Sequence, residues 1–334
     1  MKFGVIIQPD NLAQLPERAR LAEEAGFDYL GVAESQSLAR ELYVSLSVVA
    51  QATKKVRIGP TVTNPLTRHP AVTASAIASI NELSGGRAFL GIGTGNNSVL
   101  NLGLRPARLA QVKEYIEAVR TVLSGQSYRY QQRTIHVGWS RAAVPILVSA
   151  EGPRTLAMAG AEADAALFHT GLTSEVLRDS VERIREGERA AGKPEGSTEV
   201  WAFAKCSIAG RREQAIGEIK TALAGSAHTA FRFTLEGKHV PEALREPIST
   251  LCREYTSAQH EQLSETRRAA LSDELGLTDY LADRFAVAGT PAQCREKTRA
   301  IQRAEVAGLF ITSYGAQQEE TIRRFGREVI AHFR

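Results

Sequence analysis

The sequence has little cysteine and no long hydrophobic run, and these absences exclude several classes of protein. Its 3 cysteines, Cys206, Cys252 and Cys294, lie too far apart for a disulfide framework or a close metal-ligand cluster. No stretch of about 18 apolar residues is present, so we expect no transmembrane helix. Gln8 and Asp10 come too early for the apolar core of a signal peptide. These absences predict a cytoplasmic protein with no metal site and no contact with a membrane.

The charge pattern lacks the basic block that nucleic-acid-binding proteins carry. The net charge is +4, but lysine and arginine alternate with acidic residues, as in the segment 183–189. Such mixing is typical of a solvated surface rather than of a nucleic-acid interface. Hydrophobic residues make up 43% and charged residues 23% of the 334 residues, which indicates an ordinary globular protein.

Segments typical of strands and of helices alternate along almost the whole chain. The expected strands are Phe3–Ile7, Asp28–Ala33, Val56–Thr63, Arg87–Ile92, Pro145–Ala150, Ala165–Phe168, Glu199–Ile208 and Gly308–Thr312. Eight strand–helix units predict an α/β protein with a (β/α)8 fold, the TIM barrel, and a doubly wound sheet is the main alternative. The units continue to the C-terminus without a change in composition. We therefore favour a barrel that forms one domain over residues 1–334.

Two segments interrupt this alternation. Residues near 127–138 alternate in polarity around Gln131, which predicts a small hairpin insertion. Residues near 230–284 are polar and helix-forming, and we expect a helical insertion at the C-terminal face of the barrel. This second insertion could form a lid and would supply residues that select the substrate.

The active site of a barrel lies at the C-terminal ends of its strands, where three side chains are catalytic candidates. Glu34 follows the second strand, and it is either an acid–base group or an ion-pair partner of Arg40 or Arg68. His169 follows the sixth strand, and it either donates to a ligand or is a hydrogen-bonded residue of the barrel rim. Tyr314 follows the eighth strand and has the same two interpretations.

The segment after the fifth strand is a candidate phosphate site. A strand ends here and a helix begins, and the free N–H groups of a helix N-terminus suit an anion. A tight turn without a ligand is the alternative, and the loop after the sixth strand is a second candidate. The residues of these two loops are Ser149, Glu151, Gly152, Pro153, Arg154, Thr170 and Gly171.

The glycine-rich loop after the fourth strand is not a dinucleotide fingerprint. Gly93, Thr94 and Gly95 precede the next expected helix, at Pro106, by about ten residues, whereas a fingerprint helix starts within the loop. A glycine-lined floor for a flat ligand is the better interpretation. A P-loop, a zinc-binding helix and a nucleophile elbow are all excluded by missing residues.

Four runs together resemble the bacterial-luciferase-like superfamily, and most closely its branch with methylenetetrahydromethanopterin reductase. The runs are Gly59–Pro65, His69–Ala78, Glu82–Ala88 and Leu90–Gly95, and Ser149–Pro153 and Ala288–Pro291 also fit. The resemblance covers nearly the whole chain. It implies a TIM barrel that binds FMN or the 5-deazaflavin coenzyme F420 at its C-terminal face.

The resemblance also implies roles for particular residues. Strand three supports the cofactor ring, which points to Thr61, Val62, Thr63 and Asn64, with Gly93, Thr94 and Gly95 nearby. Gly152, Arg154, Thr170 and Gly171 would hold the phosphate end. A non-proline cis peptide is expected at Thr61–Val62 or Val62–Thr63. Relatives often carry a histidine after strand two, and this chain has Glu34-Ser35-Gln36 instead.

We interpret the sequence as a two-component FMN-dependent monooxygenase that acts on a small organic substrate. A separate NAD(P)H flavin reductase would supply its reduced FMN. The alternatives are a coenzyme F420-dependent reductase or dehydrogenase that transfers hydride, and a non-catalytic flavin-binding protein. The helices expected at Glu41–Thr53 and Pro70–Leu83 carry apolar residues on several faces, and relatives suggest the same surface, so we expect a homodimer.

Overall fold

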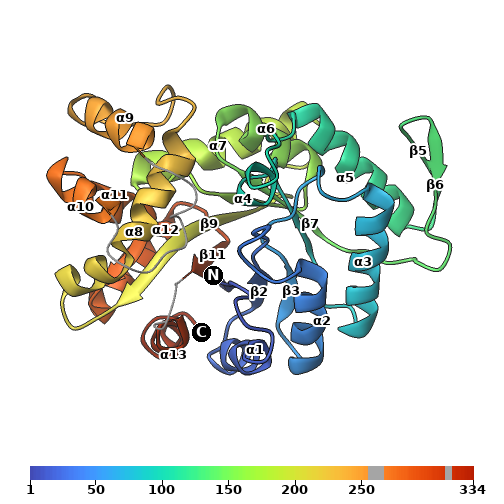
Figure 1. The fold of residues 1–334 in the computed structure, drawn as a ribbon, viewed down its shortest axis with the longest axis horizontal. Helices are drawn as coiled ribbons and strands as arrows, with labels where there is room; N and C mark the ends of the chain where they lie inside the picture. The colour runs from blue at the N-terminus through green and yellow to red at the C-terminus, as the bar shows by residue number, and fades with distance from the viewer. Residues whose placement is uncertain (255–266, 313–317) are drawn as a thin grey trace.

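The computed structural model describes residues 1–254, 267–312 and 318–334, and it is a TIM barrel, as predicted (Figure 1). Neighbouring strands run parallel in the order β3-β2-β1-β11-β9-β8-β7-β4. Bridges between Ile58 and Ala88 and between Thr63 and Ile92 join the two ends of this order. The barrel strands are β1 (Lys2–Ile7), β2 (Tyr29–Val32), β3 (Arg57–Pro60), β4 (Leu90–Ile92), β7 (Ile146–Ala150), β8 (Ala165–Phe168), β9 (Glu199–Ile208) and β11 (Gly308–Thr312).

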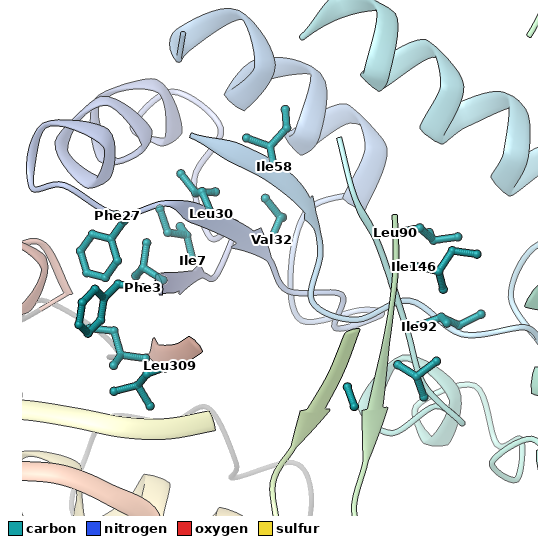
Figure 2. Packing of buried hydrophobic residues seen from close by; sticks show 14 of the residues in the cluster. Phe3, Ile7, Phe27, Leu30, Val32, Ile58, Leu90, Ile92, Ile146 and Leu309 are labelled. Carbon is teal, nitrogen blue, oxygen red and sulfur yellow. The ribbon is translucent and has the colours of Figure 1, made fainter. Parts of the chain in front are cut away.

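Helices cover the outside of the barrel, and the larger hydrophobic core lies between them and the strands. Figure 2 shows Phe3, Leu30 and Ile58 of this core on β1, β2 and β3. The helices are α1 (Leu15–Glu24), α2 (Leu42–Ala52), α3 (Pro70–Leu83), α5 (Leu109–Leu123), α6 (Pro153–Glu162), α7 (Ser174–Ala190), α8 (Arg212–Phe231), α12 (Pro291–Arg303) and α13 (Gln318–Glu328), followed by the 3-10 turn η4 (Ile330–His332). None of the helices in the described ranges is long and apolar enough to span a membrane.

The inside of the barrel is filled in layers, because alternate residues of a strand point to opposite faces. On β9, Ala202, Ala204 and Cys206 belong to the outer core. Trp201 belongs to a separate inner cluster, and Phe203 packs against that cluster. The inner cluster consists of Ile6, Phe89, Leu147, Leu167, Trp201 and Phe310.

The two predicted insertions are present. The antiparallel hairpin β5 (Tyr128–Tyr130) and β6 (Arg133–Ile135) stands at the edge of the molecule, away from the barrel (Figure 1). The helical insertion follows α8 and packs against it in a second hydrophobic cluster. Its described elements are η1 (Glu242–Leu244), α9 (Arg245–Glu254), α10 (Arg267–Glu274) and α11 (Thr278–Phe285).

Several predicted boundaries are corrected by the structure. β3 ends at Pro60 rather than Thr63, and the peptide bond between Thr61 and Val62 is cis, as the resemblance led us to expect. A short helix, α4 (Asn97–Leu100), follows the glycine loop. α5 begins at Leu109 rather than Pro106. A further strand, β10 (Ala286–Gly289), pairs with the last four residues of β9.

Candidate active site

A cavity of about 1020 Å³ opens at the C-terminal ends of the barrel strands. Strand ends and the loops that follow them form its base and one wall. The C-terminal end of α8 and the loop 232–238 form another part of its lining. A cavity of this size is sufficient for a cofactor or a drug-sized ligand.

Most of the residues predicted from the sequence line this cavity. They are Glu34, Thr61, Val62, Gly93, Thr94, Gly95, Ser149, Glu151, Gly152, Pro153, Arg154 and His169. Thr63 and Asn64 are buried and do not line it. Thr170 lines a small neighbouring cavity, and Gly171 lines neither of the two. Tyr314 lies outside the described residues.

Glycines make room for the irregular backbone between β3 and β4. A Cβ atom on Gly31 would lie 1.9 Å from Thr61 Oγ1. A Cβ atom on Gly91 would lie 2.2 Å from the Pro60 carbonyl oxygen, and one on Gly93 would lie 3.2 Å from Val62 Cγ2. The three glycines therefore let Thr61 and Val62 bend into the cavity wall.

Glu34 lines the cavity and is the centre of a polar network that includes the buried residues Thr63 and Asn64. Its Oε1 pairs with Arg68, and its Oε2 accepts hydrogen bonds from Thr63 Oγ1 at 2.9 Å and from Asn64 Nδ2 at 3.1 Å. The Glu34 side chain is only 8% exposed. Of the two ion-pair partners that the sequence left open, Arg40 and Arg68, the structure pairs Glu34 with Arg68. It also links Glu34 to the loop after β3.

His169, Phe203 and Lys205 form part of the cavity base. The rings of His169 and Phe203 lie 4.5 Å apart, and Lys205 Nζ lies 4.7 Å from the centre of the Phe203 ring. His169 Nε2 is buried and has no hydrogen-bond partner among the described residues. Burial and the charge of Lys205 lower the pKa of His169 to about 3, so the imidazole is neutral near pH 7.

Two cations and a carboxylate lie at another part of the lining. Arg232 donates to Asn96 Oδ1 at 2.8 Å, but its Nε is buried without a partner in the described part of the chain. Lys238 is 9% exposed and donates to the carbonyl of Ala230. Burial lowers the pKa of Arg232 and of Lys238, and it raises the pKa of Glu151, whose charge both cations partly stabilise. An anion placed here would meet both cations.

The beginning of α6 lines the cavity near these charges. Gly152 is its N-cap and supplies no side-chain hydrogen bond, and Pro153 occupies the first turn. The first N–H groups of the helix are therefore not satisfied by a capping side chain. This arrangement fits the phosphate site predicted at residues 151–154.

The second predicted phosphate loop is occupied by an arginine of the insertion. Arg284 Nε donates to the Thr170 carbonyl at 3.1 Å, and a Cβ atom on Gly171 would lie 2.7 Å from Arg284 Cγ. Thr170 Oγ1 pairs with Ser180 Oγ at 2.9 Å. Thr170 and Gly171 therefore contact protein groups, and Thr170 lines the small cavity that shares Glu151, Gly152 and Lys238 with the large one.

Sequence reasoning missed several residues of the cavity. Arg232 and Lys238 lie in an irregular loop, so no periodic pattern marks them, although the expected substrate-selecting insertion includes both. Phe203 follows from the alternation along β9 once the barrel is accepted. The remaining unpredicted lining includes Asn97, Ser98, Pro106, Ala107, Arg108, Leu109, Ser226, Thr229, Phe233, Thr234, Glu236 and Gly237. No group of three or more metal-ligating side chains occurs within the described ranges.

Comparison with known proteins gives consistent matches over the full length. A family model described as luciferase-like monooxygenase matches residues 1–308. The 5,10-methylenetetrahydromethanopterin reductases of Archaeoglobus fulgidus and Methanolobus tindarius are 28% and 29% identical, over 99% of this chain and 99% and 100% of theirs. The coenzyme F420-dependent tetrahydromethanopterin reductase of Methanopyrus kandleri superposes with a TM-score of 0.79 at 25% identity, covering 100% of this chain and 99% of that structure.

These relatives contradict the expected two-component FMN-dependent monooxygenase. The two relatives from Archaeoglobus fulgidus and Methanolobus tindarius are named as reductases, and the structural relative from Methanopyrus kandleri is named for its dependence on coenzyme F420. Monooxygenases of known structure match at only 14–18% identity, and likeness at that level shows the fold alone. The alternative of an F420-dependent reductase, which the sequence also left open, agrees better with the comparisons.

Proposed function

The chain belongs to the luciferase-like monooxygenase family and is an oxidoreductase, and from this premise we propose that it uses the deazaflavin coenzyme F420. In the proposed reaction, hydride passes between the coenzyme and a small organic substrate, and oxygen takes no part. The full-length likeness to reductases supports this choice over an oxygenase. The flavin reductase expected as a partner belonged to the monooxygenase interpretation and has no role in this reaction.

The residues present fit such a coenzyme, which has a flat ring and a phosphate-bearing side chain. The wall at Thr61, Val62 and Gly93 would support the ring. The observation that carries the proposal is the orphaned Nε of Arg232, which lines the same cavity as Lys238 and the uncapped start of α6. Two cations and free helix N–H groups suit a phosphate.

When bound, the coenzyme would supply the hydride chemistry. The protein would position the coenzyme and the substrate and would exclude water from the ring. Ile6, Ala33 and Phe203 line the base with apolar groups and would keep water from the ring. Glu34 holds Thr63 and Asn64, so it would fix the loop that carries the ring wall. Its pairing with Arg68 favours this positioning role over proton transfer.

Titration of the purified chain tests the cofactor. We expect the oxidised deazaflavin to saturate near one equivalent per chain, and FMN to bind more weakly. Lys238→Met should weaken deazaflavin binding by about 10-fold, since it removes one charge-assisted contact. Lys220→Met is the matched control, because Lys220 pairs with Asp273 on α10 and does not line the cavity.

Turnover tests the reaction class. Reduction of the bound deazaflavin by an oxidisable substrate, or its reoxidation by a reducible one, should proceed equally with and without oxygen. Binding of FMN alone, or turnover that requires oxygen, would contradict the proposal.

A further inference from the structure

A carboxylate lies among the cations that line the large cavity. Glu151 follows β7 and directly precedes Gly152, the N-cap of α6. It lines the cavity together with Arg232 and Lys238. Burial raises the pKa of Glu151, and the charges of the two cations oppose that shift. The three groups therefore interact electrostatically and belong to one part of the lining.

These three groups do not neutralise one another by direct contact. Arg232 donates to Asn96 Oδ1 at 2.8 Å, and Lys238 donates to the carbonyl of Ala230, so neutral oxygens hold both cations. Glu151 forms no ion pair and accepts no hydrogen bond from any residue within the described ranges. Its carboxylate oxygens therefore remain available to a hydrogen-bond donor on a ligand.

The donor must reach Glu151 from the large cavity. The small neighbouring cavity shares Glu151, Gly152 and Lys238 with the large one, but its volume is about 10 Å³. That volume is enough for at most one water molecule. Two of its other polar groups already face each other, since His239 Nε2 lies 3.6 Å from Asp179 Oδ2. A ligand group larger than water can approach the carboxylate only from the large cavity.

The arrangement recognises an anion and a hydrogen-bond donor side by side. Arg232 and Lys238 suit the negative oxygens of a phosphate. The carboxylate of Glu151 repels those oxygens, but it accepts a hydrogen bond from a hydroxyl group next to them. A phosphate with an adjacent hydroxyl group gains both interactions. A phosphate with only apolar neighbours gains the attraction of the cations and keeps the repulsion from the carboxylate.

We propose that Glu151 is a specificity-determining residue that selects ligands with a hydroxyl group next to the phosphate. The ligand class is a polyol phosphate. This proposal deepens the proposed function and rests on it, because it takes Arg232 and Lys238 as the site of the coenzyme phosphate. For the side chain of the coenzyme, the arrangement requires hydroxyl groups beside that phosphate.

Two phosphate monoesters test this selection without any turnover. Methyl phosphate and glycerol 2-phosphate carry nearly the same charge at pH 8, because the second pKa of such esters is about 6. Only glycerol 2-phosphate has hydroxyl groups. Each ester is titrated by calorimetry into the wild type and into Glu151→Gln, and the ratio of the two affinities measures the preference for hydroxyl groups.

We expect the wild type to bind glycerol 2-phosphate more tightly than methyl phosphate. Glu151→Gln should reduce this preference by about 10-fold, because a hydrogen bond to a neutral acceptor is weaker than one to a charged acceptor. The same variant should bind methyl phosphate about 2- to 10-fold more tightly, since a like charge has been removed. A residue that only stabilises the loop would not change the two affinities in opposite directions.

Two further variants control for charge and for reach. Glu236→Gln removes a carboxylate that lines the same cavity but is exposed, and it should change the preference by less than about 2-fold. Glu151→Asp keeps the charge and shortens the side chain, so it should lower the preference without tightening methyl phosphate. Circular dichroism establishes that each variant is folded, and Glu151→Asp remains informative where Glu151→Gln is not.

The outcome separates this proposal from the proposed function. The same preference in the wild type and in Glu151→Gln would overturn the role of Glu151, and so would a wild type that binds neither ester. Binding of the deazaflavin in either of those cases would leave the proposed function standing. A wild type that fails to bind the deazaflavin, but loses its preference for hydroxyl groups in Glu151→Gln, would remove the proposed function and retain the selection.

Discussion

Substitution of Arg284 is the clearest single test of how the helical insertion is attached to the barrel. Arg284 is 1% exposed and has no salt bridge with a described carboxylate. Its guanidinium instead donates to the carbonyls of Thr170 at 3.1 Å, Lys238 at 2.6 Å and His239 at 3.2 Å. A hydroxyl oxygen, that of Tyr280, accepts a fourth bond at 2.9 Å. One side chain therefore joins α11, the loop after β8 and the loop that lines the cavity.

Arg284→Met keeps most of the apolar stem and removes all of these donors. The buried carbonyls of Thr170 and Lys238 each lose a partner, at a cost of about 1–3 kcal/mol per group. Relief of the desolvation of the guanidinium offsets part of this cost. We expect a net loss of about 3–5 kcal/mol in the free energy of unfolding. With an unfolding entropy of roughly 2.1 cal/mol/K per residue, a chain of 334 residues should then melt about 4–7 °C lower.

Calorimetry and urea titration measure this loss. Arg178→Met is the matched control, because Arg178 is exposed and its one described hydrogen bond runs to Ser174 in its own helix. The control should change the free energy of unfolding by less than about 0.5 kcal/mol. If Arg284→Met is as stable as the control, the carbonyls find other donors and the attachment does not depend on the guanidinium.

Four further predictions follow from individual residues. The pKa of His169 is lowered in the folded chain from 6.5 to about 3. The free energy of unfolding of the wild type should therefore fall relative to that of His169→Gln as the pH drops from 6.5 towards 3. An equal pH dependence of the free energy of unfolding in the two proteins would contradict this. Gly31→Ala forces a Cβ onto Thr61 Oγ1 and should cost about 1–3 kcal/mol, whereas Gly210→Ala, with open space around it, should be nearly neutral in urea unfolding. Glu34→Gln should weaken coenzyme binding, and a fall in turnover of about 10²–10⁴-fold at unchanged affinity would instead favour the acid–base role. We propose a homodimer through α2 and α3, where Val72 is 55% exposed; light scattering should give a dimer for the wild type and a monomer for Val72→Glu.

The barrel could be predicted because its strands carry strong local patterns. β1, β7 and β11 are apolar runs bounded by polar or turn residues, and the helices α3, α6 and α12 each begin at a proline. β10 was missed because Ala286–Gly289 is short and alanine-rich, and its pairing with the last residues of β9 is a tertiary contact. The predicted strand Val56–Thr63 is longer than β3 because Thr61, Val62 and Thr63 favour extended backbone. No residue pattern in the sequence indicates the bend at Thr61.

Some residues of the candidate site could also be predicted from local sequence patterns, and others could not. The glycine loop and the start of α6 could be placed from sequence, because strand ends and helix starts define them. Arg232 and Lys238 could not, since only the packing of the insertion brings that loop to the cavity. The partner of Glu34 was left open between Arg40 and Arg68, and only the three-dimensional structure selects Arg68.

The monooxygenase prediction, which the comparisons contradict, has a physical cause in the motif that carried the resemblance. Gly59, Gly91 and Gly93 are required because a Cβ atom would meet the Phe89 carbonyl, the Pro60 carbonyl and the Val62 side chain. These glycines shape a cavity wall that would suit a flat ring, and the rings of a flavin and a deazaflavin have nearly the same outline. Packing residues of this kind therefore cannot indicate whether oxygen or a substrate carbon takes the electrons. That choice depends on the other groups around the ring, and in this chain Lys205 and His169, which line the base of the same cavity, are the groups to change first.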